Sequence, residues 1–83
     1  MKKIIIYTTS WCHWCQKTKK FLENLGYSYE ERNVELNQEW EKELIQKLGQ
    51  NSIPVTLVID EKGKERLIIG YDPLSLKEAL EEN

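Results

Sequence analysis

The fold is decided by residues 3–15, KIIIYTTSWCHWC, in which a strand-like run leads directly into a pair of cysteines. The run from Lys3 to Thr8 is rich in β-branched and aromatic residues, which predicts a buried strand. The polar pair Thr9-Ser10 follows as a turn, and a helix is expected to begin at about Cys12. Cys12 and Cys15 therefore lie where the strand passes into the helix.

The expected helix carries an inward stripe that includes the second cysteine. The members of the stripe are Cys15, Thr18, Leu22 and Leu25. Their spacing of +3, +7 and +10 is typical of one helix face, and Gly26 predicts the helix end. We therefore expect the sulfur of Cys15 to face the protein interior and that of Cys12 to lie at the exposed N-terminal end.

A second strand and helix are expected next. Residues 27–34 contain Tyr and Val, but four consecutive polar residues dilute them and favour a strand at the edge of the sheet. Asn37 is expected to cap a helix that ends at Gly49. The apolar positions of this helix are Trp40, Leu44, Ile45 and Leu48. We expect them to face the core.

The last part of the chain predicts a hairpin and a final helix. Strands are expected over Val55–Ile59 and about Glu65–Ile69, joined by a turn at 60–63. Asp72 is expected as the N-cap of a helix with Pro73 in its first position, although Ser75 with Glu78 offers a competing capping box one turn later. The predicted order is β-α-β-α-β-β-α, an α/β fold with one four-stranded mixed sheet and three flanking helices.

Length and composition exclude several classes of protein. The 83 residues (9.9 kDa) predict a single domain over 1–83. With 40% hydrophobic and 31% charged residues the chain fits neither a disordered nor a membrane protein, and no apolar run approaches the roughly 20 residues of a spanning helix. The apolar run after Lys2-Lys3 is too short for a signal peptide. We expect a cytoplasmic protein with no membrane partner.

Positive charge is concentrated near the cysteines. The basic residues of 1–20 are Lys2, Lys3, Lys17, Lys19 and Lys20. They give +5 with no acidic residue, against 7 − 14 = −7 for the rest of the chain. Five lysines without arginine in a protein of pI 5.4 are weak evidence for a nucleic-acid-binding surface, so no nucleic-acid partner is expected. Two interpretations stay open, a solvated helix face and a positive field around the cysteines.

The C-x-x-C spacing of Cys12 and Cys15 favours redox chemistry. As a structural crosslink it would close a loop of four residues, which removes only about 2 kcal/mol of unfolded-state entropy. As a zinc site it lacks partners, because the only histidine, His13, lies inside the motif, and no resident metal is expected. A redox dithiol is the favoured interpretation, with metal or cluster binding and an inert pair as alternatives.

Three segments together resemble the glutaredoxins, a family of the thioredoxin fold. They are WCHWC at 11–15, SIPV at 52–55 and GYD at 70–72, and the resemblance extends over essentially the whole chain. It implies a thiol–disulfide oxidoreductase that reduces protein disulfides or glutathione mixed disulfides and functions in electron transport and redox homeostasis. No tightly bound cofactor is implied, and we expect a monomer.

The chemistry of the motif predicts separate roles for the two cysteines. The nucleophile in thiol–disulfide exchange is the thiolate, so the thiol of Cys12 must be acidified. The helix N-terminus, a protonated His13 and the ammonium of Lys17 would supply the positive field, although His13 could also be a solvent-facing residue with little effect. Our hypothesis is that Cys12 attacks the substrate disulfide and Cys15 resolves the mixed disulfide.

The residues expected to contact substrate or glutathione are Trp11, Trp14, Ile53, Pro54, Tyr71 and Asp72. Trp11 and Trp14 would form an apolar collar around the thiol. The resemblance implies a cis Ile53–Pro54 bond and main-chain hydrogen bonds from Ile53 to an extended substrate. For Asp72, a contact to the amino group of glutathione and a helix cap alone stay open.

Departures from the family pattern leave the reductant open between glutathione and thioredoxin reductase. Glutathione-using members commonly carry Lys or Arg where this chain has Thr9. The segment 70–73 resembles redoxins that donate electrons to ribonucleotide reductase and are reduced by thioredoxin reductase. An alternative function is a glutathione-dependent [2Fe–2S] carrier or sensor that uses Cys12 in a dimer.

Overall fold

A computed structural model describes residues 2–81 of the chain. Its elements are β1 (Lys3–Thr8), α1 (His13–Asn24), β2 (Glu30–Asn33), α2 (Gln38–Lys42), the π-helix η1 (Glu43–Lys47), β3 (Val55–Ile59), β4 (Glu65–Ile69) and α3 (Pro73–Glu81). Because η1 continues α2 without a break, the order is the predicted β-α-β-α-β-β-α. None of the helices in residues 2–81 is long and apolar enough to cross a membrane.

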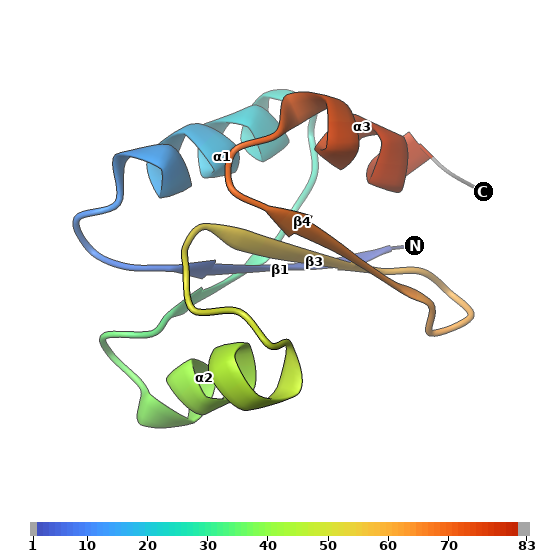
Figure 1. The fold of residues 1–83 in the computed structure, drawn as a ribbon. Helices are drawn as coiled ribbons and strands as arrows, with labels where there is room; N and C mark the ends of the chain where they lie inside the picture. The colour runs from blue at the N-terminus through green and yellow to red at the C-terminus, as the bar shows by residue number, and fades with distance from the viewer. Residues whose placement is uncertain (1, 82–83) are drawn as a thin grey trace.

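The four strands form one mixed sheet in the order β2-β1-β3-β4. β1 is parallel to β2 and antiparallel to β3, and β3 and β4 form the predicted hairpin. β2 lies at the edge, as predicted, but is shorter than the expected 27–34. Helices α1 and α3 cover one face of the sheet, and α2 lies on the opposite face (Figure 1).

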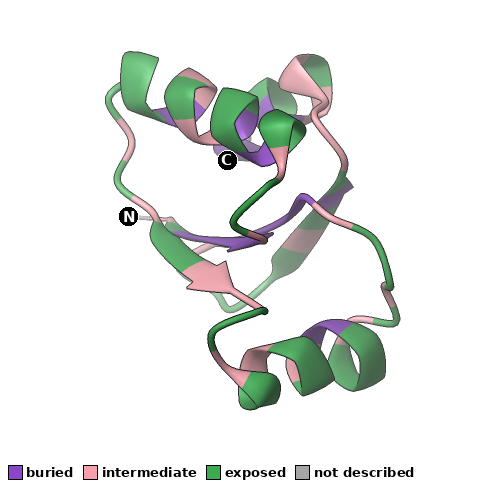
Figure 2. Cartoon of the chain, turned by 90° about the vertical axis from the view of Figure 1, so that its left-hand side faces the viewer, coloured by how far each residue is buried: buried purple, intermediate pink, exposed green. Residues whose placement is uncertain are grey.

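Each face of the sheet has its own apolar cluster. The cluster under α1 and α3 contains Ile4, Leu22, Val58, Ile68, Leu76, Ala79 and Leu80. The cluster on the α2 side contains Ile5, Tyr7, Leu44, Val55 and Leu57. Figure 2 shows the buried residues on the central strands and on the helix surfaces that face them. The sheet is thus a rigid platform covered on both sides, with the first helix fixed on one of them.

The end of α1 confirms one prediction and corrects another. Gly26 has φ +83°, and the Tyr27 N–H donates to the Leu22 carbonyl at 3.0 Å, a glycine-type helix stop. Leu25 was expected on the inward stripe, but its side chain is exposed. The helix ends at Asn24 and Leu25 is its C-cap, so the inward stripe does not extend to this position.

The second helical segment begins as predicted and then departs from α-helical geometry. Asn37 caps it, accepting a backbone N–H at 2.8 Å. Across η1 the Leu48 N–H donates to the Glu43 carbonyl at 3.0 Å, five residues back. Leu44 is buried, but Ile45 is exposed, so the predicted inward position of Ile45 is wrong. The wider turn of the π-helix changes which side chains face the sheet.

Candidate active site

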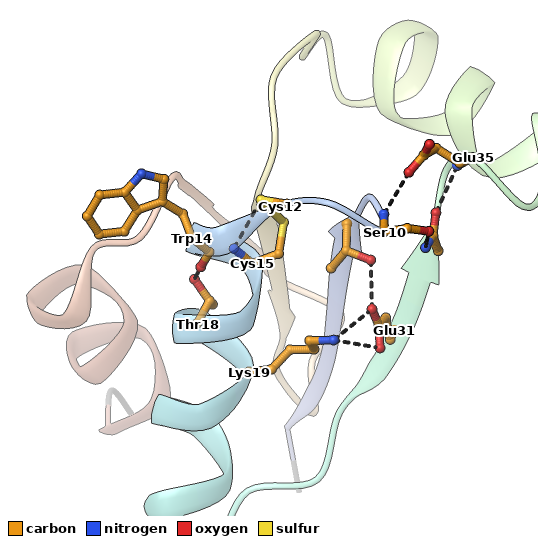
Figure 3. Close-up of a disulfide and its surroundings, with 10 residues drawn as sticks. Ser10, Cys12, Trp14, Cys15, Thr18, Lys19, Glu31 and Glu35 are labelled. Carbon is orange, nitrogen blue, oxygen red and sulfur yellow. Dashed lines mark hydrogen bonds and ion pairs between the residues drawn. A yellow bond between two sulfur atoms is a disulfide. The ribbon is translucent and has the colours of Figure 1, made fainter.

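The two cysteines lie where the sequence predicts, between β1 and α1 (Figure 3). Cys12 is the N-cap of α1, with φ −88° and ψ 106°, and its N–H donates to the Thr9 carbonyl at 3.4 Å. Cys15 lies in the first turn of the helix, and the two residues are joined by a disulfide with 5.1 Å between their Cα atoms. The structure therefore has the oxidised form of the C-x-x-C pair.

The two cysteines differ in exposure in the predicted sense. The side chain of Cys15 faces the sheet and the residue is 1% exposed, whereas Cys12 is half-buried. An incoming disulfide would therefore meet the sulfur of Cys12 before that of Cys15.

The helix N-terminus provides a hydrogen bond to the outer sulfur. The backbone N–H of Cys15 donates to Sγ of Cys12 at 3.0 Å. The N–H groups of the first helical turn lack intrahelical acceptors and carry partial positive charge. A thiolate on Cys12 would be stabilised by both effects, which lower the pKa of a thiol at a helix N-terminus.

One of the lysines after the motif is paired with an acidic residue, whereas another lies over an aromatic ring. The ammonium of Lys17 lies 5.0 Å from the centroid of the Trp14 ring, a cation–π contact. That of Lys19 forms an ion pair with Glu31 at 3.0 Å. His13 is exposed, with its ring at 5.9 Å from that of Trp14. Lys19 is thus partly neutralised, and Lys17 and His13 stay as candidates for tuning the thiol.

Two of the expected aromatic residues come together beside the dithiol. Trp14 stacks on Tyr71, with ring centroids 5.9 Å apart and 24° between the planes. Tyr71 also contacts Phe21 edge-on at 6.4 Å. Trp11 is 91% exposed and Trp14 is 53% exposed, so both present apolar surface to solvent next to Cys12. The stack connects the start of α1 to the segment that precedes α3.

The loop before β3 has the backbone form that the resemblance implies. The Ile53–Pro54 peptide is cis, which confirms that prediction. Pro54 is buried, and its carbonyl accepts the Gly70 N–H at 2.8 Å. Ile53 is half-buried against the cluster on the α2 side.

Asp72 is the helix cap that the sequence predicts. Its Oδ1 accepts the Ser75 N–H at 3.1 Å, and its Oδ2 accepts the Ser75 hydroxyl at 2.8 Å. The hydroxyl and the N–H of Ser75 together lower the pKa of Asp72 below its ordinary value. Both carboxylate oxygens are therefore already engaged within the chain.

Sequence reasoning missed a polar network between the sheet and η1. The Tyr7 hydroxyl donates to Oε1 of Glu43 at 3.0 Å, and Nη1 of Arg32 donates to the same oxygen at 2.6 Å. Burial, followed by the hydrogen bond to Glu43, raises the pKa of Tyr7 above its ordinary value. The partners lie on three elements far apart in the sequence, so no local pattern indicates the network.

A second missed network lies under α1. The Thr8 hydroxyl donates to Glu31 at 2.8 Å, and the same carboxylate is paired with Lys19 (Figure 3). Burial acts to raise the pKa of Glu31, but the hydrogen bonds from Thr8 and Lys19 outweigh it and lower the pKa. The network attaches the dithiol helix to the edge strand β2.

Within residues 2–81, no three side chains of His, Cys, Asp or Glu gather into a group that could hold a metal ion.

The sequence model of the glutaredoxin family matches residues 4–63. This chain belongs to the glutaredoxin family. A glutaredoxin of Pseudomonas aeruginosa is 33% identical over 54 residues, which are 65% of this chain and 64% of that protein. The matched segment thus spans less than two thirds of this relative's length.

Two solved structures extend the comparison across the fold. A thioredoxin-like protein superposes with a TM-score of 0.82 over 100% of both chains, at 24% identity, which shows the thioredoxin-like fold. The NrdH-redoxin of Escherichia coli, a glutaredoxin-like protein with a thioredoxin-like activity profile, superposes with a TM-score of 0.72 over 90% of this chain and 92% of its own, at 29% identity. In this glutaredoxin-family chain the C-x-x-C pair is Cys12–Cys15, joined as a disulfide.

Proposed function

We propose that this chain is a dithiol–disulfide oxidoreductase in which Cys12 attacks and Cys15 resolves. The observation that carries the proposal is the position of Cys12: its sulfur caps α1, accepts the Cys15 N–H at 3.0 Å and is the less buried of the two. A sulfur in this position can be held as a thiolate and reached by a substrate, and these are the two requirements for attack.

The reaction transfers two electrons from the dithiol to a substrate disulfide. The Cys12 thiolate attacks one substrate sulfur, a mixed disulfide forms, and the other substrate sulfur leaves as a thiolate that takes a proton from solvent. The Cys15 thiol then loses its proton and attacks Sγ of Cys12. The second substrate thiolate leaves, and the Cys12–Cys15 disulfide of the present structure is the product.

The surroundings of the dithiol favour protein partners over glutathione as the reductant. Thr9 offers no cation to a glutathione carboxylate, and both oxygens of Asp72 are bonded to Ser75. The exposed rings of Trp11 and Trp14 offer apolar contact area, which is typical of protein interfaces. The similarity to an NrdH-redoxin with a thioredoxin-like activity profile points the same way. We therefore expect a reductase of the thioredoxin-reductase type.

A coupled assay tests both the activity and the reductant. The oxidised protein is offered either thioredoxin reductase or glutathione with glutathione reductase, and NADPH consumption is followed with a disulfide substrate. We expect turnover with thioredoxin reductase, no turnover for Cys12→Ser, and a trapped mixed disulfide for Cys15→Ser. Faster turnover with glutathione would contradict the reductant, and no turnover in either arm would contradict the activity.

A further inference from the structure

The turn that precedes Cys12 is held by hydrogen bonds from residues outside the C-x-x-C motif. Between the end of β1 and the start of α1 the chain turns within four residues, and the Cys12 N–H donates to the Thr9 carbonyl across the turn. Ser10 lies at the outside of this turn and is exposed. At 3.4 Å the bond from Cys12 to Thr9 is long for an N–H···O hydrogen bond, so it holds the turn weakly.

Glu35 and Asn33 hold Ser10 through both its backbone and its side chain. Oε1 of Glu35 accepts the Ser10 N–H at 2.6 Å, a charge-assisted bond, and Nδ2 of Asn33 donates to the Ser10 hydroxyl at 3.1 Å (Figure 3). The two holders are fixed to each other, because Oδ1 of Asn33 accepts the Glu35 N–H at 2.9 Å. We call these three residues the clasp.

The clasp is attached to the rigid sheet. Thr8 is paired with Asn33 in the register of β1 and β2, and the Val34 N–H donates to the Thr8 carbonyl at 2.9 Å. The strand pair therefore fixes the position of Glu35. The hydrogen bond from the Ser10 N–H to Glu35 then holds the backbone two residues before Cys12. The interaction joins two loops that are 25 residues apart in the sequence.

We propose that Glu35 is a positioning residue for Cys12, which keeps the outer sulfur on the Cys15 N–H through its hydrogen bond to Ser10. The inference rests on the proposed function, because its consequence is the reactivity of the attacking thiol. The thiolate gains the hydrogen-bond part of its stabilisation only while sulfur and N–H remain aligned, because hydrogen bonds weaken steeply with misalignment. Without the clasp, the reduced form of the pair would be stabilised less.

Two matched pairs of proteins separate the hydrogen bond from the charge of Glu35. Glu35→Gln and Glu35→Ala both remove the charge, but only Gln keeps an acceptor of the same reach. Wild type and Glu35→Asp both keep the charge, but Asp is one methylene shorter. The same Gln and Ala substitutions at Glu41, exposed on α2, serve as controls.

The measurement is the alkylation rate of Cys12 by iodoacetamide in the reduced protein, across a pH series that spans the thiol titration. Below the thiol pKa we expect Glu35→Ala to react about two- to tenfold more slowly than Glu35→Gln, the effect of one hydrogen bond of ordinary net strength. Glu35→Asp should be slower than wild type in the same way. Equilibration with glutathione buffers should show a more reducing potential for the slower member of each pair.

The inference is overturned if the members of each pair alkylate at equal rates and have equal potentials. It is also overturned if they differ only in the denaturation midpoint of the oxidised protein, because the clasp would then stabilise the fold alone. If Glu35→Ala does not fold, the comparison of wild type with Glu35→Asp decides. Alkylation needs no partner protein, so these results are independent of whether the coupled assay shows turnover.

Discussion

The sheet face under α1 and α3 is held mainly by apolar packing, with the Thr8–Glu31–Lys19 network at its edge strand. On the face under α2 and η1 the helix buries less apolar surface, and the polar network of Tyr7, Arg32 and Glu43 contributes more. Helix α1 buries three of its side chains, while in α2 and η1 together the one buried residue is Leu44. The helix that carries the dithiol is therefore fixed mainly by packing, to which the Thr8–Glu31–Lys19 network adds. The helix on the opposite face depends more on hydrogen bonds and charge.

The difference corresponds to what each face does in the proposed function. Cys15 must stay buried while Cys12 is attacked, and close packing of α1 holds the sulfur of Cys15 in place. The α2 side carries no part of the disulfide, and its segment changes from α-helix to π-helix at Glu43, the residue that joins the network. The bond from Glu43 to the sheet thus lies where the helix geometry changes.

Truncation of a core side chain on the α1 face should have the largest effect. Leu22 is fully buried between helix and sheet, so Leu22→Ala should lower the free energy of unfolding by about 3 to 5 kcal/mol. Leu44→Ala on the opposite face should have a smaller effect, about 2 kcal/mol, because α2 and η1 bury no other side chain and this segment is expected to move into the space left. Urea denaturation of the oxidised proteins measures both. Equal losses would contradict the proposed difference between the faces.

Removal of Glu43 should have the next largest effect. Glu43→Ala leaves the Tyr7 hydroxyl and the Arg32 guanidinium without their shared acceptor, and we expect a loss of about 1 to 3 kcal/mol of unfolding free energy. Glu41→Ala removes a carboxylate from the same helical segment without touching the network and should be nearly neutral. If the two variants are equally stable in urea, the network does not hold this face.

The pH dependence of stability gives a second measure of the same network. The pKa of Tyr7 is raised in the folded protein, so the neutral phenol is favoured there. The resulting stabilisation is present below the unfolded pKa of about 10 and is lost as pH rises through the higher folded pKa. Tyr7→Phe should therefore weaken the loss of stability at alkaline pH. An unchanged alkaline profile would mean that Tyr29, whose pKa is also raised, accounts for the whole effect.

The sequence predicted correctly those elements whose bounds depend on neighbouring residues alone. The bounds of β1 and the hairpin after Pro54 agree with the structure because β-branched runs and turn residues determine them. Leu25 and Ile45 were placed wrongly because their orientation depends on where α1 ends and on the π-helix. The clasp at Ser10 could not be predicted, since its partners meet only after β1 and β2 have paired.

The smallest expected effect concerns Thr56, a polar residue on the apolar face. It is fully buried on β3, two residues before Val58 of the α1-side cluster, and its hydroxyl has no hydrogen-bond partner among residues 2–81. Thr56→Val keeps the shape and removes the unpaired group, so we expect stability to rise by up to about 1 kcal/mol. Thr18→Val is the control, because the Thr18 hydroxyl donates to the Trp14 carbonyl at 2.9 Å and its loss should destabilise by a similar amount. If both variants lose stability, the Thr56 hydroxyl has a partner in solution, and the α1 face depends on polar contacts as the α2 face does.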